Sequence, residues 1–581
     1  MADTTTINPA TQANAKSSKI ERFPIQMRFN NLKNQGLLWY PAWRDLSLYL
    51  NPTRGFFFNA VPNSGYKIDH SVVIDGYAAR CIRDLASGMI SGLTSPSRPW
   101  FKLEIEDPEL MEFDPVKRYF DEVQLRMHSV LAKSNIYECL HMEYEEIATF
   151  GTCSMSILDD YNDVIRGRVF TIGEYFLGQG PDNRVNTFAR QFWMTVAQLV
   201  KEFGLKNCSD SVQSLYKTHN TENWIKILHL IEPNDDRIPG YADFENMEYR
   251  SLYFEDNAMQ DRYLELGGFE EFPVMAARWK LTTTADVYGR GPGWDILGDD
   301  KMLQKEQREK LLILAKVGNP PMQADASVQN VNTLPGGLTR SSSLLPNAGV
   351  RAAYQVSPDI NAVREDILEI KKAMDDSFHR DLFRMLLNEA SRPANVTATE
   401  IAEKQSERLS MISPVVTKLG NELLKPTLSR VYNIMNKFGL LPKAPKEIAE
   451  MDIHVQYISI LAQAQRMIGI TALENDIAFG MNIAKGTGDM SVLDNYNIDE
   501  IAQEHSKAIG NPAKTRNAPD VVVAKRKARA EAQAKAENAA AMSQIAAGAK
   551  DAGAAAKDLA SAPMNTNSAL DRVLSGITGR Q

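Results

Sequence analysis

The sequence predicts an α+β protein, and three features of its pattern support this prediction. Stretches with apolar residues at helical spacing fill most of the first 150 residues. From Gly151 the pattern changes to short alternating runs separated by Gly, Pro, Asn and Asp, which is typical of antiparallel strands. Two long amphipathic segments follow at 294–317 and 359–387. We therefore expect a helix-fronted α+β region followed by two helical rods.

Three helices are expected before the strands, at about 20–50, 71–93 and 115–149. Pro41 interrupts the first of these patterns, and Pro96 and Pro99 prevent the second from continuing. Beside them, Trp100 and Phe101 could stack on a nucleobase, but we expect them to anchor the chain in the core.

Six runs in the next region are predicted to be strands: CSMSIL, GRVFTI, NTFARQFWM, WIKILHLI, MEYRSLYF and FPVMAARW. One amphipathic helix is expected among them, at 195–203. A further run, MDIHVQYISIL at 450–460, predicts a strand that returns to the β region.

The two rods have clear end signals. Gly318 followed by Asn-Pro-Pro predicts the end of the first helix. Ser357, Pro358 and Asp359 suit the start of the second, as a cap, a first-turn proline and an acid at the positive helix end. The 318–358 connection is too long for an ordinary loop, so we expect a small functional subdomain there.

A polar loop, LNEASRPANVTATEI at 387–401, ends the second rod. Thr397 and Glu400 have the spacing of a capping box, which predicts a third long helix to about Lys437. Pro414 and Pro426 are its expected kink points. After Asn511 the chain becomes a mixture of Ala, Lys and Glu, which predicts either a frayed tail or a helix that needs partners.

The formal net charge of −8 argues against a protein that binds nucleic acid tightly over its whole surface, because such binding needs clustered Lys and Arg. Basic residues do gather at 525–529, but acids alternate with them, so a solvated helix face is expected. No apolar run approaches the ~18 residues of a membrane span. The polar N-terminal stretch lacks the apolar core of a secretion signal.

Catalytic and metal-binding patterns are weak. Cys81, Cys139, Cys153 and Cys208 stand far apart, which predicts buried reduced thiols rather than disulfides or a zinc site. The acidic pairs at 159–160 and 299–300 could bind a cation, but exposed turn or helix-start positions are the expected reading. Phosphate-loop, HExxH, GxSxG and strand-associated GxGxxG motifs are absent. We expect no catalytic residue, no metal and no cofactor.

Several segments, in order along the chain, resemble the portal or head-to-tail connector proteins of short-tailed bacteriophages. They are LWYPAWRDLSLYLNPTRG (38–55), SGLTSPSRPWFKLE (91–104), FGTCSMSI (150–157), RQFWMTVAQLVKEFG (190–204), WIKILHLIEP (224–233), FEEFPVMAARW (269–279), YGRGPGWDIL (288–297), VGNPP (317–321) and VQYISILAQAQR (455–466). Their order and spacing make the resemblance fairly specific, although it gives no support to the tail after about Asn511.

The resemblance implies a portal architecture with a helical and β wing, a two-helix stem, a small α/β clip insert and a helical C-terminal crown. The implied segments are a flexible N-terminus (1–19), the N-terminal wing (20–293), stem helix 1 (294–317), the clip (318–358), stem helix 2 (359–387), a channel loop (388–396), the C-terminal wing (397–466), the crown (467–510) and an Ala-rich tail (511–581).

The resemblance also implies a dodecameric ring at one capsid vertex of the virion, made in the host cytoplasm. Double-stranded DNA would pass through the ring without sequence-specific binding. Its protein partners would be the large terminase subunit, a tail adaptor, and the major capsid and scaffolding proteins, with no membrane contact.

Three groups of candidate residues follow from this resemblance. The channel-loop candidates are Asn388, Ser391, Arg392 and Asn395; Arg392 either contacts DNA weakly or bonds an acid of an adjacent subunit. The channel-facing stem candidates are Glu365, Asp366, Glu369, Lys372 and Asp376. The clip candidates for partner binding are Asn319, Gln323, Arg340 and Arg351.

Two alternatives come from other functional classes. A nucleic-acid-processing phage enzyme would need its own active site, and ATPase and nuclease assays would reveal it. A purely structural tail adaptor should be shorter and should lack the paired stem helices.

Overall fold

A computed structural model describes 20–55, 72–97, 99–105, 107, 110, 113–238, 240–241, 243–256, 262–324, 326, 328, 330–332, 334, 337–340, 350–354, 359–380, 412–448, 454–457, 476–483, 485–486, 496–497, 500–501 and 519–560. The chain divides into two compact units, Met1–Asn511 and Pro512–Gln581. The first unit is a mixture of helices and antiparallel sheets, as the α+β prediction requires.

Five helices are described before the sheets: α1 (Arg22–Leu37), α2 (Tyr40–Leu50), α3 (Tyr77–Leu93), α5 (Asp114–Lys133) and α6 (Ile136–Phe150). The break between α1 and α2 is confirmed, and Pro41 lies in the first turn of α2. The single helix predicted at 115–149 is wrong, because α5 ends before Ser134 and α6 starts after Asn135. Asn135 explains the break, since its side chain bonds both backbone groups of Gly167 in a neighbouring strand.

Two antiparallel sheets follow. One has the order β3-β2-β9, from β2 (Thr152–Asp160), β3 (Val164–Phe170) and β9 (Val274–Arg278). The other runs β4-β5-β6-β7-β8, from β4 (Tyr175–Gln179), β5 (Val185–Thr195), β6 (Trp224–Pro233), β7 (Tyr249–Glu255) and β8 (Glu265–Phe269). All six predicted strands are confirmed, while β4 and β8 were not predicted.

Two short helices lie within the strand region. Helix α7 (Val196–Phe203) is the predicted amphipathic helix, and Thr195 and Gln198 form its capping box. Helix α8 (Asp210–Lys217) was not predicted, because it is short and buries only Val212.

The largest hydrophobic core joins helices and sheets of the first unit. Trp43, Phe101, Tyr144 and Phe150 are among its largest fully buried side chains. Trp100 is also buried, with its indole nitrogen donating to Tyr137, so the expected anchoring role of this segment is confirmed. All four cysteines are free and buried, as predicted.

Helix α9 (Pro292–Gly318) starts in direct backbone contact with the end of α6. A Cβ atom added to Gly293 would lie 2.3 Å from the carbonyl oxygen of Thr149, and one added to Gly291 would lie 2.5 Å from that of Ile147. Gly151, which ends α6, has a left-handed φ of 81°. The glycines of YGRGPGW therefore allow a close approach that no side chain would permit.

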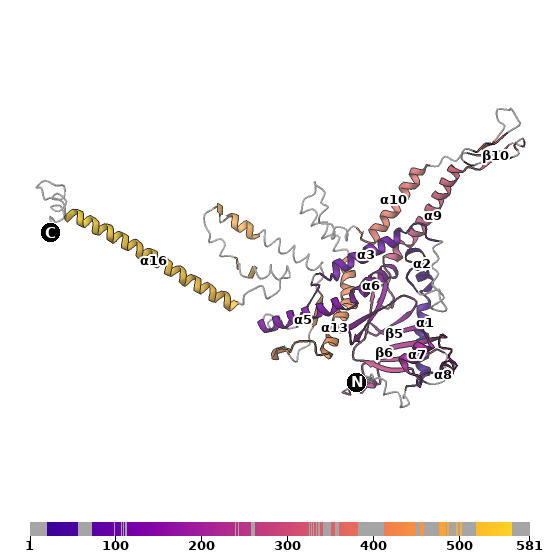
Figure 1. The fold of residues 1–581 in the computed structure, drawn as a ribbon, viewed down its shortest axis with the longest axis horizontal. Coiled ribbons are helices and arrows are strands. Elements are labelled where there is room, and N and C mark those ends of the chain that lie inside the picture. Colours follow the sequence, from indigo (N-terminus) through magenta and orange to yellow (C-terminus); the bar gives the residue numbers. More distant parts are fainter. Residues whose placement is uncertain are drawn as a thin grey trace. The chain divides into compact units, whose positions relative to one another are not determined.

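Helices α9 and α10 (Ile360–Ser377) lie side by side (Figure 1). Strand β10 (Met322–Ala324) follows α9 in the chain, strand β11 (Val350–Ala352) precedes α10, and the two strands pair antiparallel. The predicted start of α10 is shifted, because Asp359 rather than Ser357 is the capping residue. Its predicted end near 387 is also wrong. The helix ends at Ser377, and His379 adopts a left-handed φ of 50°.

The C-terminal part of the first unit returns to the N-terminal part. Helical residues from Ile412 lead through a π-helix (Gly420–Leu424) into α13 (Lys425–Lys437), which ends where the sequence predicted. Strand β12 (His454–Tyr457) confirms the predicted strand, but its predicted partner is wrong. It pairs with β1 (Phe101–Glu104), which precedes Gly151, rather than with a strand of the β region. The start of the third helix, with its Thr397–Glu400 capping box, lies outside the described residues.

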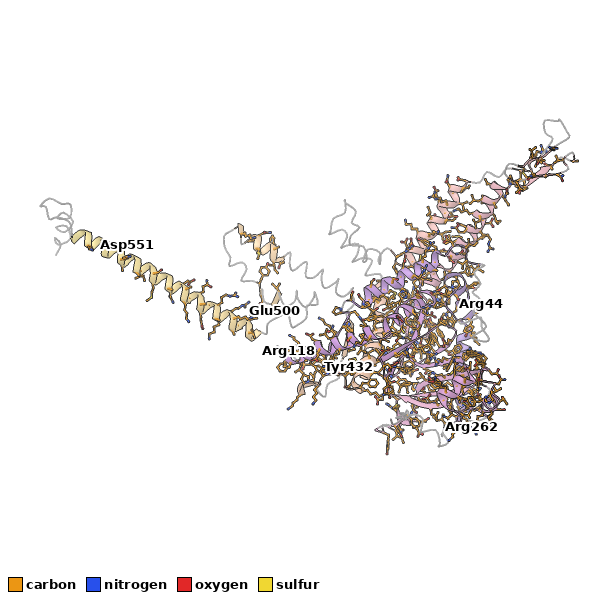
Figure 2. All side chains as sticks on the ribbon, in the orientation of Figure 1. Arg44, Arg118, Arg262, Tyr432, Glu500 and Asp551 are labelled. Atoms are coloured by element: carbon orange, nitrogen blue, oxygen red, sulfur yellow. The ribbon has the colours of Figure 1, made fainter. Side chains whose placement is uncertain are left out.

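The second unit contains α16 (Pro519–Ala560), so the described part of the tail is helical. Its side chains, including the labelled Asp551, stand out along the helix (Figure 2). The described side chains between 521 and 557 are exposed or nearly so, including those of the basic run at 525–529, as expected for a solvated face.

Replacing Gly293 with Ala is expected to lower the free energy of unfolding by roughly 2–3 kcal/mol, because the new Cβ collides with the Thr149 carbonyl. Urea unfolding followed by circular dichroism measures the change. Gly298→Ala is the matched control in the same helix. A Cβ there meets nothing within 4 Å, so this change should stabilise by about 0.5–1 kcal/mol. Equal effects of the two substitutions would contradict the packing argument.

Candidate functional site

The base of the α9–α10 hairpin is held by one carboxylate, that of Asp75, which lies just before α3. It accepts from Lys371 of α10 at 2.6 Å, from Gln307 of α9 at 3.1 Å and from Arg80 of α3 at 3.2 Å. Three helices are thus tied to one acid. Neither helix of the hairpin can therefore rotate about its axis without breaking one of these bonds.

Gln304 of α9 also attaches this helix to residues 74 and 75. Its side-chain oxygen accepts from the backbone nitrogens of Ile74 and Asp75, and its nitrogen donates to the Asp75 carbonyl. The same nitrogen donates to Asp300, whose side chain is fully buried. The amide therefore pairs with a backbone segment as a neighbouring strand would.

A second network ties the end of α10 to α3. Arg380 donates to Asp84 at 2.5 Å and to Asp375 at 3.0 Å. Tyr77 donates to Asp375 at 2.7 Å and accepts from Arg380. Burial raises the pKa of Asp375, but the bonds from Tyr77 and Arg380 outweigh it and bring the pKa below its ordinary value.

Neither network was predicted from the sequence, which holds one signal for them. Lys371 lies between the apolar positions Ile367 and Met374 of an amphipathic helix, where a cation needs a partner. Asp300 contradicts its prediction, because it is buried rather than exposed at a helix start. Its carboxyl accepts from Gln304, whose amide also binds the backbone of residues 74–75, a long-range contact that local sequence does not reveal.

The far half of α9 is apolar without being buried in this chain. Leu311, Leu312, Leu314 and Val317 are each between 43% and 55% exposed. Helix α10 contacts α9 from one side only, through a stripe in which Ile367 and Ile370 are buried. A helix that is apolar on several sides is normally covered on several sides.

The five stem candidates lie on α10 and are exposed: Glu365, Asp366, Glu369, Lys372 and Asp376. Asp366 also lies close to Glu306 of α9. Burial and this neighbouring carboxyl raise the pKa of Glu306. The exposed face of α10 is therefore mainly acidic.

The clip candidates are exposed too, but they are not all in one element. Asn319 caps the end of α9, Gln323 lies in β10 and is paired with Arg351 of β11, and Arg340 lies in the connection between the strands. The channel-loop candidates Asn388, Ser391, Arg392 and Asn395 lie outside the described residues.

Proteins of similar sequence show which family this chain belongs to. The family model described as "Bacteriophage head to tail connecting protein" matches residues 23–516. The chain is 36% identical to the probable portal protein of Bordetella phage BPP-1, over 97% of this chain and 100% of that protein. It is 37% identical to the portal protein of Salmonella phage epsilon15, over 92% of this chain and 95% of that protein.

The chain belongs to the bacteriophage head-to-tail connecting protein family. The suspected resemblance is thereby confirmed, and membership makes the chain a virion protein of the portal vertex. Among solved structures, a chain in the neck of an empty GTA particle is similar with a TM-score of 0.33 and 11% identity. That match covers 68% of this chain and 86% of the other, and it adds nothing to the assignment.

No group of three or more His, Cys, Asp or Glu side chains in the described part of the chain could hold a metal ion. Among the helices that the structure describes, none is both long and apolar enough to cross a membrane.

Asp300 predicts a pH dependence of stability. Burial raises its pKa from 3.8 to about 7, and the nearby charge of Asp75 acts in the same direction. The folded state thus holds a proton that the unfolded chain releases. Its stabilising effect is fully present below pH 3.8 and is lost as the pH rises through about 7.

Asp300→Asn should flatten the decline in unfolding free energy between pH 4 and pH 7, because an amide does not titrate. Urea unfolding at a series of pH values measures it. Asp299→Asn, the adjacent and more exposed acid, is the control and should leave the slope unchanged. An unchanged slope in Asp300→Asn would contradict the burial argument.

Proposed function

We propose that this chain is the subunit of a dodecameric portal ring, through which double-stranded DNA enters the capsid and later leaves it. The observation that carries the proposal is the match to two portal proteins along nearly the whole chain. A second copy on each side would also cover the exposed apolar end of α9. A closed ring does this for every subunit without leaving an open edge.

In this proposal α9 and α10 form the stem, 318–358 forms the clip, and the regions 20–293 and 397–466 form the wing. The crown is 467–510, and the loop 388–396 reaches the channel. Asp75 and Gln304 support the assignment of a stem, since they hold both rods at one place on the N-terminal region.

An acidic stem suits a channel through which DNA slides. Each phosphate that a protein neutralises adds salt-dependent affinity, so a basic lining would hold DNA in place. The exposed Glu365, Glu369 and Asp376 of α10 instead repel the phosphates. Lys372 is the exposed base among the five stem candidates, and it offers a weak contact.

The proposed partners follow from the positions of the exposed segments. The clip would contact the large terminase subunit during packaging and a tail adaptor afterwards, through Asn319, Gln323, Arg340 and Arg351. The wing and crown would meet the major capsid and scaffolding proteins. We further propose that the chain is not an enzyme, so the purified protein should show neither ATPase nor nuclease activity.

Replacing Leu311 and Leu314 together with Asp is expected to prevent ring assembly, because two charges would be buried between neighbouring subunits. Native mass spectrometry and negative-stain imaging measure the subunit number. Circular dichroism should stay unchanged, since both side chains are exposed in the single chain.

Lys305→Asp, at an exposed polar position of the same helix, is the control and should still assemble. Rings of unchanged size from the double variant would exclude this face as the subunit contact. A wild-type chain that stays monomeric under all conditions would count heavily against the portal proposal itself.

Arg392→Glu tests the channel loop. If Arg392 contacts DNA weakly, the reversed charge should reduce the amount of packaged DNA and its retention in the head. Packaging assays in particles assembled with the variant measure both. Unchanged packaging and retention would contradict the DNA contact and favour the alternative, a bond to an acid of an adjacent subunit.

A further inference from the structure

The helix that contains Pro426 has an irregularity at a defined place. It is α-helical from Ile412 to Leu419, forms a π-helix at Gly420–Leu424, and is α-helical again in α13. A π-turn holds one residue more than an α-turn and occurs mostly as a single bulge, often at functional positions. Pro426 explains its position, because a proline ring collides with the carbonyl four residues earlier in an α-helix.

The apolar pattern requires the same extra residue. Leu419 and Leu428 are both fully buried, yet they are nine residues apart. At about 100° per residue, nine α-helical residues would place them on opposite sides of the helix. With one residue absorbed by the π-turn, the angle between them falls to about 80°. The π-turn therefore lets both halves bury their apolar sides in one core.

One ion pair lies at this turn. Glu422, inside the π-helix, accepts from the side chain of Arg278 at 2.6 and 3.2 Å and from its backbone nitrogen at 2.9 Å. Arg278 is almost fully buried in β9 and also donates to the carbonyl oxygens of Asn183 and Asp286. Since Arg278 is held by the sheet, Glu422 can reach it only when the turn is in its present register.

The two halves of the helix are held differently. After the π-turn, Arg430 and Asn433 both bind Glu271, at 2.9 and 2.8 Å. Before it, the inward side chains of the described residues 412–419 are apolar: Ile412, Val416 and Leu419. Directional polar bonds thus hold the C-terminal half, whereas the contacts named for the N-terminal half are apolar and less directional, so movement is easier on the N-terminal side.

We propose that the π-helix at Gly420–Leu424 is a register joint, and that the Glu422–Arg278 ion pair is the latch that fixes its position. When the pair opens, the turn takes α geometry and returns its extra residue. The chain before it then advances by about 1.5 Å and rotates by about 100° relative to α13. This inference concerns the single chain and does not depend on ring assembly or on DNA.

Hydrogen–deuterium exchange of the full-length protein tests the latch. Glu422→Gln should raise exchange of the amides at 416–424 by about tenfold and change those at 428–437 less than twofold, because only the N-terminal half gains freedom. Glu271→Gln is the matched control: it weakens the other anchor of the same helix and should leave 416–424 unaffected. Equal changes along the helix, or none, would overturn the latch.

Single-residue deletions test whether the π-turn holds one residue more than the helix needs. Deleting Asn421, an exposed residue of the π-turn, should convert it to α geometry while both apolar faces stay aligned. The deletion should therefore lower the free energy of unfolding by no more than Glu422→Ala does, a variant in which the ion pair is also lost. Deleting Ser429, which lies in α geometry, rotates the following turns and should unfold the helix. If both deletions are equally disruptive, the joint is excluded.

Discussion

The hairpin of α9 and α10 depends on a contact between two stretches of backbone. Helix α9 starts against the last carbonyls of α6, at a separation that leaves no room for a Cβ atom at Gly291 or Gly293. Because carbonyl groups in a helix cannot rotate away, this contact fixes where α9 begins and in which direction it runs. Asp75 and Gln304 then fix its rotation and hold α10 beside it. These contacts therefore determine the position of the exposed half of the hairpin.

Charge is used in two different ways along this hairpin. At its base, a Lys or Arg side chain pairs with each of Asp75, Asp84 and Asp375, and these ion pairs hold the helices together. Farther along α10, Glu365 and Glu369 are exposed and remain available to act on whatever lies nearby. Acidic side chains thus serve as anchors where helices surround them and as a repulsive surface where they are exposed.

Much of the fold could be predicted because its signals are local. The strand pattern after Gly151, the Gly-then-Pro stop after α9 and the capping box of α7 each depend on neighbouring residues. The misses have long-range causes. Asn135 divides α5 from α6 through bonds to a distant strand, and the buried Asp300 accepts from Gln304, whose amide also binds residues 74–75. At His379 no glycine or proline marks the end of α10, and the apolar spacing continues beyond it. The α10 acids were correctly expected on a helix, but the Asp75 and Arg380 networks needed the tertiary structure.

The helical conformation of α16 is stabilised in a different way from that of the helices in the first unit. Its 42 residues would span ~63 Å, and its alanines offer almost no side chain for packing. Helicity there comes from the intrinsic preference of Ala, Lys and Glu, which is gained residue by residue. Warming would therefore fray this helix gradually from its ends, while the core of the first unit unfolds in a cooperative step. Residue-averaged helicity and the calorimetric transition would consequently report on different parts of the same chain.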